Sequence, residues 1–423
     1  MIPPRNLPQP TPHAATSRTG NGASPRAPTS TANTEKLVAD QLALESRKRR
    51  RGKNANKEND NVDAPDVDNH QTSYQSYGRY VARLIDFFQV LDRVVDVGIR
   101  SEVDSDMDDA MEEDAEKTNK DYMLEDWSTC CRVMPDFRKT MLSLAQSLAY
   151  RHELCRHIGR GIEAVRSDDC AALKDRLPSF ILFDTKQTLD PPISSTGNKN
   201  DRGWRHPITA TLLCPIDKPA TNETFKAYED GALIVSPKDL PRFLYPHDQA
   251  YNPEDLFEGV FRGHLLIRAA KCILIGRSCA VSRPGFSTRR RGNAALAGIT
   301  TVNPRIIAYI VVQVRFALTS EPEWGRKDSS NKSSNKRSAA FDYHAFYRSV
   351  LSALEDDEEG MAEIIGYWNY ELWGSRAGAD SGPTHSGSGN SSDDDNPGEE
   401  SALDRLKAQR AAKRARLTAQ PAT

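Results

Sequence analysis

NPRIIAYIVVQVRFAL, residues 303–318, is the stretch on which the fold class depends. It contains the longest apolar run in the chain, and its many β-branched residues would suit a buried strand. Its length and its start favour a buried helix, because Asn303 can cap a helix and Pro304 loses no intrahelical hydrogen bond at the first helical position. The pattern of residues 306–318 alone leaves both structures open.

Apolar residues recur at helical spacing on both sides of this stretch. They predict amphipathic helices over residues 81–95, 134–149, 152–177, 343–354 and 361–372. Two further helix starts are predicted at Ser236-Pro237 and Asn252-Pro253, which repeat the capping pattern of Asn303-Pro304, and the second of these helices is expected to run to Ile273. The sequence therefore predicts a mainly α protein with a single multi-helix domain over residues 73–374.

Polar and charged segments flank and interrupt this domain. Residues 1–72 and 375–423 are predicted to be disordered tails, because they are too poor in apolar residues to offset the entropy lost on ordering. Within the domain, residues 101–117 are predicted to form an acidic loop. Residues 194–201 and 325–339 are predicted to be polar surface loops.

The composition says more about the cellular compartment of the protein than about its activity. The net charge of −2 gives no global signal for nucleic acid or for an acidic membrane. None of the seven cysteines forms a CxxC pair, which favours reduced, buried thiols. No apolar stretch follows the N-terminus, and the longest apolar run is too short to cross a bilayer. We therefore expect neither secretion nor membrane insertion, and the nucleus or the cytoplasm remains.

Two dense basic clusters lie in the predicted tails. Such clusters are typical of nuclear import signals or of contacts to nucleic-acid phosphates, and the alternative is a solubilising charge run. The C-terminal cluster could also form a transient helix on a phosphate backbone. The cluster residues are Arg47, Lys48, Arg49, Arg50, Arg51 and Lys53 near the N-terminus, and Lys407, Arg410, Lys413, Arg414 and Arg416 near the C-terminus.

A group of polar residues lies among strongly apolar segments in the second half of the domain. Buried arginines need partners, and Glu254, Asp255 and Glu258 are near enough in sequence to form a structural ion-pair network. The alternative is a ligand pocket. The candidate pocket residues are Arg242, Tyr245, Arg262, His264 and Arg277.

No motif identifies catalytic chemistry, a cofactor or a metal. The contexts of the available Cys, Ser and His residues lack a nucleophile elbow or a triad signature. His152, Cys155 and His157 with Cys130 and Cys131 invite a zinc site. The adjacent Cys-Cys pair is poorly arranged for chelation, so these positions are expected to be ordinary helix residues.

Several sequence blocks resemble a domain family of unknown function that is expanded in mushroom-forming basidiomycete fungi. The resemblance covers about residues 135–374, and the blocks occur in the family's order. They are RGW at 202–204 with HP at 206–207, LLCP at 212–215, PRFLY at 241–245, FRGHLL at 261–266, KCILIGRS at 271–278, STR at 287–289, IAY at 307–309, VRFAL at 314–318 and WN at 368–369.

The resemblance implies a fungal protein with a helical domain and brings no activity, substrate or site residue. The chain departs from the family pattern at residues 276–279, GRSC, where the family tends to have Gly-Pro-Ser-Ser, and in the acidic stretch 102–116.

The function that these features favour is a non-enzymatic nuclear interaction module. The helical domain would bind an unknown protein partner, and the basic tails would support import and contacts to nucleic acid. One alternative is an enzyme of unrecognised type with a polar pocket at Arg242, Arg262, His264 and Arg277. Another is a domesticated or mobile-element-associated protein, suggested only by the expansion of the family.

Overall fold

The protein is mainly α, as predicted. The computed structural model describes residues 74–103, 118–195, 198–288, 290–322, 324, 341–379, 405, 406, 408, 409 and 412. Twelve α-helices and no strand occur among these residues. None of these helices is long and apolar enough to cross a membrane. The helices are α2 (Tyr74–Val81), α3 (Leu91–Val103), α4 (Asn119–Val133), α5 (Phe137–Ser143), α6 (Leu148–Arg176), α7 (Pro207–Leu213), α8 (Asn222–Glu229), α9 (His264–Ala270), α10 (Asn293–Leu296), α11 (Pro304–Leu318), α12 (Tyr343–Glu355) and α13 (Glu358–Trp373).

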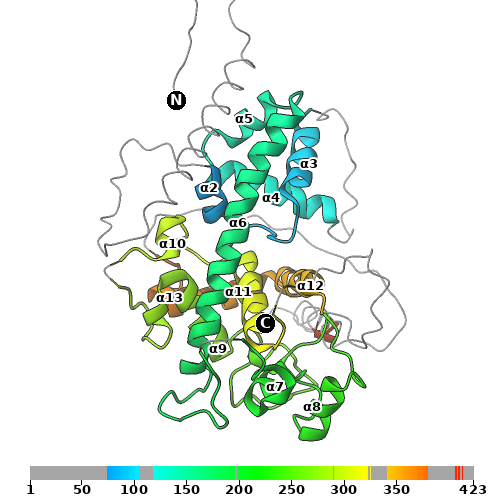
Figure 1. Ribbon diagram of the computed structural model, residues 1–423, viewed down its shortest axis with the longest axis vertical. Helices are drawn as coiled ribbons and strands as arrows, with labels where there is room; N and C mark the ends of the chain where they lie inside the picture. Colours follow the sequence, from blue (N-terminus) through cyan, green and yellow to red (C-terminus); the bar gives the residue numbers. More distant parts are fainter. Residues whose placement is uncertain are drawn as a thin grey trace, which may run out of the picture.

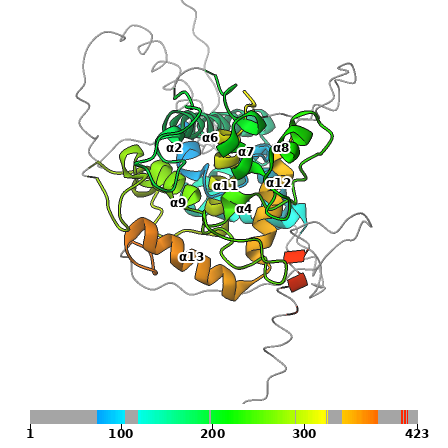
Figure 2. The ribbon, with the colours of Figure 1, turned by 90° about the horizontal axis from the view of Figure 1, so that it is seen from below.

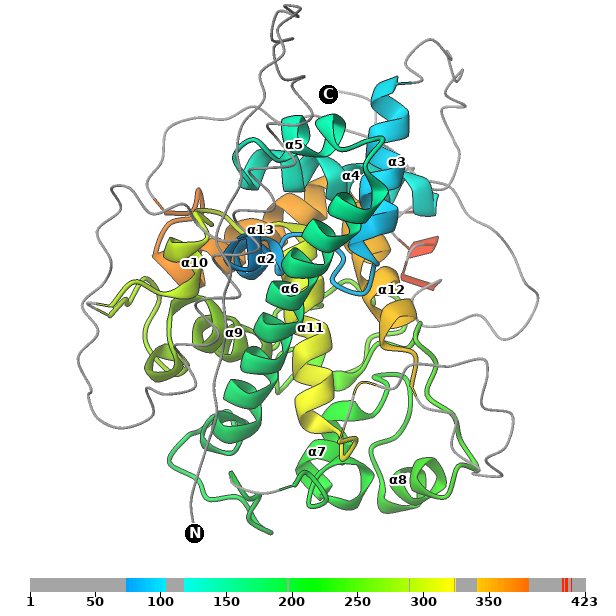
Figure 3. The same cartoon turned by 45° about the horizontal axis from the view of Figure 1, so that its top comes forward.

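The long helix α6 connects the two ends of the molecule. Helices α2–α5 gather around its first half, and α7 and α8 lie to the right of its C-terminal end (Figure 1). Helix α11 runs beside the second half of α6 (Figure 3). Seen from below, α11 lies in the middle, surrounded by α6, α7, α9 and α12 (Figure 2). One hydrophobic cluster of buried residues reaches from Val81 to Leu372 and includes Leu406.

Residues 303–318, whose sequence would suit a strand or a helix, form helix α11 and its N-cap. Asn303 caps it, because its side chain accepts a hydrogen bond from the backbone N–H of Ile306 at 2.9 Å, and Pro304 takes the first position. Every residue from Arg305 to Leu318 is buried. A helix that is apolar on all sides is buried in a protein core. The long apolar run in this stretch therefore indicates a core helix.

The last carbonyl groups of α11 are buried with the rest of the helix, so protein donors must satisfy them. Lys199 Nζ donates to the carbonyl oxygen of Phe316 at 2.7 Å, and Arg202 Nη1 donates to that of Ala317 at 2.9 Å. Arg202 Nη2 also donates to the carbonyl oxygen of Lys174 at 2.7 Å, near the end of α6. Both cations therefore lie at the negative ends of helix dipoles.

The loop predicted over residues 194–201 exposes Ser194, Ser195, Asn198 and Asn200 but buries Lys199. Lys199 is only 6% exposed, and the neighbouring Arg202 is fully buried. The composition of the loop is polar, but the amino group of Lys199 is buried because it donates to a carbonyl group of α11. Burial lowers the pKa of the Lys199 ammonium to about 7.

Charged residues join α11 to the first helices. Arg83 forms a bidentate ion pair with Asp169 of α6, with N–O distances of 2.9 and 2.8 Å. The Tyr309 hydroxyl donates to the same carboxylate at 2.7 Å. All three side chains are buried. The hydrogen bond from Tyr309 of α11 therefore adds to a buried ion pair between Arg83 and Asp169.

A second buried network lies at the start of α11. Arg305 Nη1 lies 2.7 Å from Asp126 Oδ1 of α4, and that oxygen also accepts from the backbone N–H of Asp86 at 3.1 Å. The Asp86 carboxylate lies 2.8 Å from Arg348 Nε and 3.0 Å from His344 Nε2 of α12. Burial raises the pKa of the Asp126 carboxyl to about 7 although Arg305 lies beside it.

Two of the three predicted Asn-Pro or Ser-Pro helix starts are wrong. At Ser236 the hydroxyl accepts from the N–H of Lys238, and at Asn252 the amide oxygen accepts from the N–H of Glu254, so both segments are turns. The same side-chain acceptors cap helices and close turns, and the residues that follow decide between the two. The helix predicted from Asn252 to Ile273 begins only at His264 as α9, and it continues as a π-helical turn over Lys271–Ile275.

The helix predicted over residues 81–95 is also wrong as a single element. Helix α2 ends at Val81 and α3 begins at Leu91. The buried Asp86 side chain accepts from the N–H of Phe88 at 3.0 Å, which closes a turn between them. The apolar spacing persisted through the turn because every residue from 81 to 87 is buried in any case. The helices predicted over 152–177, 343–354 and 361–372 are confirmed as α6, α12 and α13, and that over 134–149 is reduced to α5.

Several predicted segments lie outside the described residues. These are the N-terminal tail, residues 104–117 of the acidic loop and residues 325–339 of the second polar loop. In the predicted C-terminal tail, residues 375–379 are described, and so are Arg405, Leu406, Ala408, Gln409 and Ala412, which are all helical.

Helices α2 and α6 cross at glycine residues. A Cβ atom added at Gly161 would lie 2.1 Å from the carbonyl oxygen of Gln75 and 3.0 Å from the Cα atom of Gly78. A Cβ atom at Gly78 would lie 2.0 Å from the carbonyl oxygen of Ile158. The neighbouring Gly159 faces open space, with no atom within 4 Å of such a Cβ. The crossing therefore depends on backbone contact at Gly78 and Gly161.

We predict opposite effects for alanine at the two glycines of α6. Gly161→Ala should lower the free energy of unfolding by about 2 kcal/mol, because the backbone of α2 must move away. Gly159→Ala should raise it by roughly 0.5–1 kcal/mol, since alanine loses less backbone entropy in a helix. Urea unfolding of the full chain measures both, and equal effects of the two substitutions would contradict the crossing.

Arg202 and Arg205 offer a matched pair for the cap of α11. Arg202→Met should lower the free energy of unfolding by about 3 kcal/mol, because buried carbonyl groups lose a charged donor. Arg205 is 69% exposed and pairs with Glu229, so Arg205→Met should cost less than about 1 kcal/mol. Urea unfolding midpoints at unchanged slope test this, and a loss at Arg202 no larger than that at Arg205 would show that the cap is dispensable.

Candidate functional site

The polar residues predicted to form a pocket are only partly brought together. A cavity of about 170 Å³ lies between α7, the loop after it and the start of α9, and Arg242, Tyr245 and His264 line it. Arg262 and Arg277 are not among its lining residues. The other lining residues are Thr211, Leu212, Ile216, Ala220, Phe243, Pro246, His247, Gln249 and Leu265.

His264 is held in its neutral form at the wall of this cavity. Its Nε2 lies 2.9 Å from the carbonyl oxygen of Ile181 and therefore carries the proton. Its Nδ1 is buried and has no hydrogen-bond partner among the described residues. Burial lowers the pKa of this imidazole to about 4, and the neighbouring Arg268 and His247 act in the same direction.

Arg242 and Tyr245 serve mainly as structural donors. Arg242 Nη2 donates to the carbonyl oxygens of Ile216 and Lys218, at 3.2 and 2.6 Å, and the buried Nε has no partner among the described residues. The Tyr245 hydroxyl donates to the carbonyl oxygen of Leu256 at 3.0 Å. Two of the lining residues therefore carry a buried polar atom without a hydrogen-bond partner among the described residues, Arg242 Nε and His264 Nδ1.

The remaining two predicted pocket residues lie elsewhere. Arg262 pairs with Glu363 of α13 at 2.8 Å, and Arg277 is exposed. In the part of the chain that the structure describes, these arginines form no ion pair with the acids expected to bind them, Glu254, Asp255 and Glu258. Sequence proximity was a poor guide because Glu363 approaches from a distant helix.

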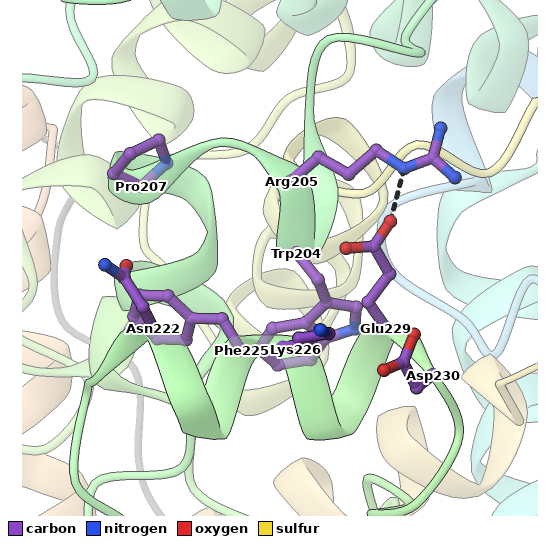
Figure 4. A pocket seen from close by; sticks show the side chains of 8 residues that line it. All are labelled: Trp204, Arg205, Pro207, Asn222, Phe225, Lys226, Glu229 and Asp230. Carbon is purple, nitrogen blue, oxygen red and sulfur yellow. Dashed lines mark hydrogen bonds and ion pairs between the residues drawn. The ribbon is translucent and has the colours of Figure 1, made fainter.

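A second, more open hollow of about 290 Å³ lies between Trp204 and α8 (Figure 4). Trp204 stacks on Tyr228 with ring centroids 4.5 Å apart, and Arg205 pairs with Glu229 at 2.6 Å. Its charged residues are exposed to solvent, so no unusual acid–base chemistry is expected there.

The C-terminal segment contacts the domain beside the first cavity. Arg405 Nη2 lies 3.1 Å from Asp217 Oδ2, and Arg405 Nη1 donates to the Tyr251 hydroxyl at 3.0 Å. Leu406 is fully buried. These contacts were missed because a segment dominated by charge and small residues was interpreted as a tail; the leucines at 403 and 406, at helical spacing, were the available signal.

Gln409 completes this contact through its amide group. Its Oε1 accepts from the backbone N–H of Leu256 at 2.7 Å, and its Nε2 donates to the carbonyl oxygen of Pro253 at 2.5 Å. One side-chain amide thus satisfies both a donor and an acceptor of the loop. All residues of the two basic clusters, from Arg47 to Lys53 and from Lys407 to Arg416, lie outside the described residues.

The residues considered for zinc are not arranged as a site. Among the described residues, no group of three or more His, Cys, Asp or Glu side chains could hold a metal ion. His157 lies 3.1 Å from Glu153, and Cys130 and Cys155 are buried. Burial raises the pKa of the Cys131 and Cys272 thiols to about 11, which disfavours nucleophilic thiolates.

We expect the neutral, buried His264 to make the stability of the protein depend on pH. Between pH 4 and 6.5 the unfolded chain binds a proton at this residue that the folded chain excludes, so stability falls as the pH falls through this range. His264→Gln keeps a donor for the Ile181 carbonyl group and cannot be protonated. From pH 7.5 to 4.5, the wild type should lose roughly 2 kcal/mol more unfolding free energy than the variant. Parallel curves from urea unfolding would show that His264 is accessible to protons.

Comparison with known proteins places the structure in a family without assigning an activity. Residues 160–373 match the model of a family of unknown function, DUF6698, and this match runs from the middle of α6 to the end of α13. It covers half of the chain, and it begins later than the resemblance from residue 135 suggested. No curated protein and no solved structure matches the chain. The chain therefore belongs to the DUF6698 family of unknown function.

Proposed function

We propose that this protein is a non-enzymatic interaction module that acts in the nucleus. The observation that carries the proposal is the contact of the C-terminal segment with the domain through Arg405, Leu406 and Gln409. In the sequence these residues alternate with Lys407 and Arg410 of the C-terminal basic cluster. Residues that contact the folded domain therefore flank Lys407 in the sequence.

The charge distribution supports a role for the tails in binding. The chain as a whole carries a net charge of −2, so attraction to phosphate must come from local clusters. Residues 47–53 contain six basic side chains in seven positions. Such a density favours recognition by an import receptor and contacts to a nucleic-acid backbone.

The alternative, an enzyme with a polar pocket, has less support. Only three of the five candidate residues line the cavity, and all three already donate to carbonyl groups of the fold. Burial lowers the pKa of the His264 imidazole to about 4, which makes this residue a poor acid–base catalyst near neutral pH. We therefore place interaction before catalysis.

Removal of the basic clusters should abolish nuclear accumulation of the tagged full chain. The test replaces the basic residues of 47–53 and 407–416 by alanine and measures the nuclear fraction by fluorescence microscopy. A matched control replaces Arg283, Arg290 and Arg291, which are exposed basic residues of the domain, and should leave localisation unchanged. Unchanged localisation of the cluster variant would refute nuclear import by these tails.

The same variants test the contact to nucleic acid. Wild-type binding to a duplex should weaken by about tenfold or more between 50 and 200 mM salt, because counterions are released from the phosphates. Binding that does not depend on salt, or that survives loss of both clusters, would remove this part of the proposal.

A further inference from the structure

The contact between the C-terminal segment and the domain has the features of specific recognition. It combines a charge pair at Asp217, a hydrogen bond to Tyr251, a fully buried leucine and a side-chain amide that binds two backbone groups. The contacts come from positions 405, 406 and 409, which lie on one face of a helix at spacings of one, three and four residues. Ala408 and Ala412 of the same segment are exposed.

The domain side of this contact is formed by structured backbone. The Tyr245 hydroxyl binds the Leu256 carbonyl oxygen at 3.0 Å, and the Asn252 side chain accepts from the N–H of Glu254. The loop that receives Gln409 is therefore fixed by the domain itself. A preformed acceptor surface lowers the entropy lost when a short helix binds.

We propose that the surface formed by Asp217, Tyr251, Pro253 and Leu256 is a docking site for the chain's own C-terminal segment, and that release of this segment makes the adjoining basic cluster available to a partner. The second part rests on the proposed function, because it assumes that the cluster is recognised in the nucleus or by an import receptor. We call the surface of these four residues the segment site.

Competition follows from the order of residues in the segment. Lys407 lies between Leu406 and Gln409, and Arg410 follows Gln409 directly. A partner that encloses the cluster must therefore contact the same short stretch of chain that the segment site holds. Docking within one chain benefits from an effective concentration in the millimolar range, so a site of modest affinity can hold the segment until a tighter partner competes.

A peptide-binding experiment tests the segment site directly. The probe is a fluorescein-labelled peptide of residues 401–417, and the receptor is the full chain carrying Leu406→Ser, whose own segment should be released. We expect saturable binding by anisotropy, at least tenfold weaker binding of a peptide with Leu406→Ser, and unchanged binding of a peptide with Ala408→Ser. The peptides carry equal charge, so nonspecific attraction to an acidic surface cannot produce this difference.

Two receptor variants sharpen the test. The wild-type full chain should bind the peptide several-fold more weakly than the Leu406→Ser chain, because its own segment occupies the site. Asp217→Asn added to the Leu406→Ser chain should weaken binding of the wild-type peptide, since Arg405 loses its charge partner. Equal affinities of the two peptides, or of the wild-type and Leu406→Ser chains, would overturn the segment site.

The link to the basic cluster needs a separate measurement. The nuclear fraction of the tagged full chain should rise with Leu406→Ser and stay unchanged with Ala408→Ser. An unchanged fraction with Leu406→Ser, in a chain whose import depends on the clusters, overturns control by docking and leaves the proposed function intact. If alanine at the clusters does not affect import, the proposed function fails, and the peptide experiment still decides whether the segment docks.

Discussion

The burial of α11 on all sides is the constraint on which the rest of the structure depends. Every residue from Arg305 to Leu318 is buried, so the donors and acceptors left unpaired at the ends of this helix need partners in the protein. Asn303 fulfils this requirement at the start, and Lys199 and Arg202 fulfil it at the end. The position of the loop between α6 and α7 follows from that need, because it must bring two cations into the core.

The same helix makes the first helices part of the domain. Arg305 lies in α11, inside the family match, and its buried partner Asp126 lies in α4, outside the match. Asp169 and Tyr309 within the match likewise receive Arg83 from outside it. A buried charge without its partner is costly, so the matched half of the chain is not self-sufficient in this protein. Arg83 and Asp126, from the region of helices α2–α4, supply charged partners for its core, and these helices also pack against it.

Sequence patterns were informative where local chemistry alone decides the structure. The spacing of Tyr343 to Leu354 predicted α12, and Asn303-Pro304 predicted the start of α11, because a cap and an apolar face are both short-range features. Ser236-Pro237 carried the same start signal and formed a turn, since no packed helical face follows it. Of the candidate pocket, Arg242, Tyr245 and His264 could be found as polar residues among apolar blocks. The separation of Arg262 from them depends on where α13 lies, which no local pattern records.

The glycine crossing of α2 and α6 has a consequence for other members of this family. Gly161 lies within the family match and Gly78 lies outside it, yet each excludes a larger residue at the other helix's backbone. A family member that carries a larger side chain at the position of Gly161 is expected to lack this close crossing, because the crossing leaves no room for a Cβ atom there.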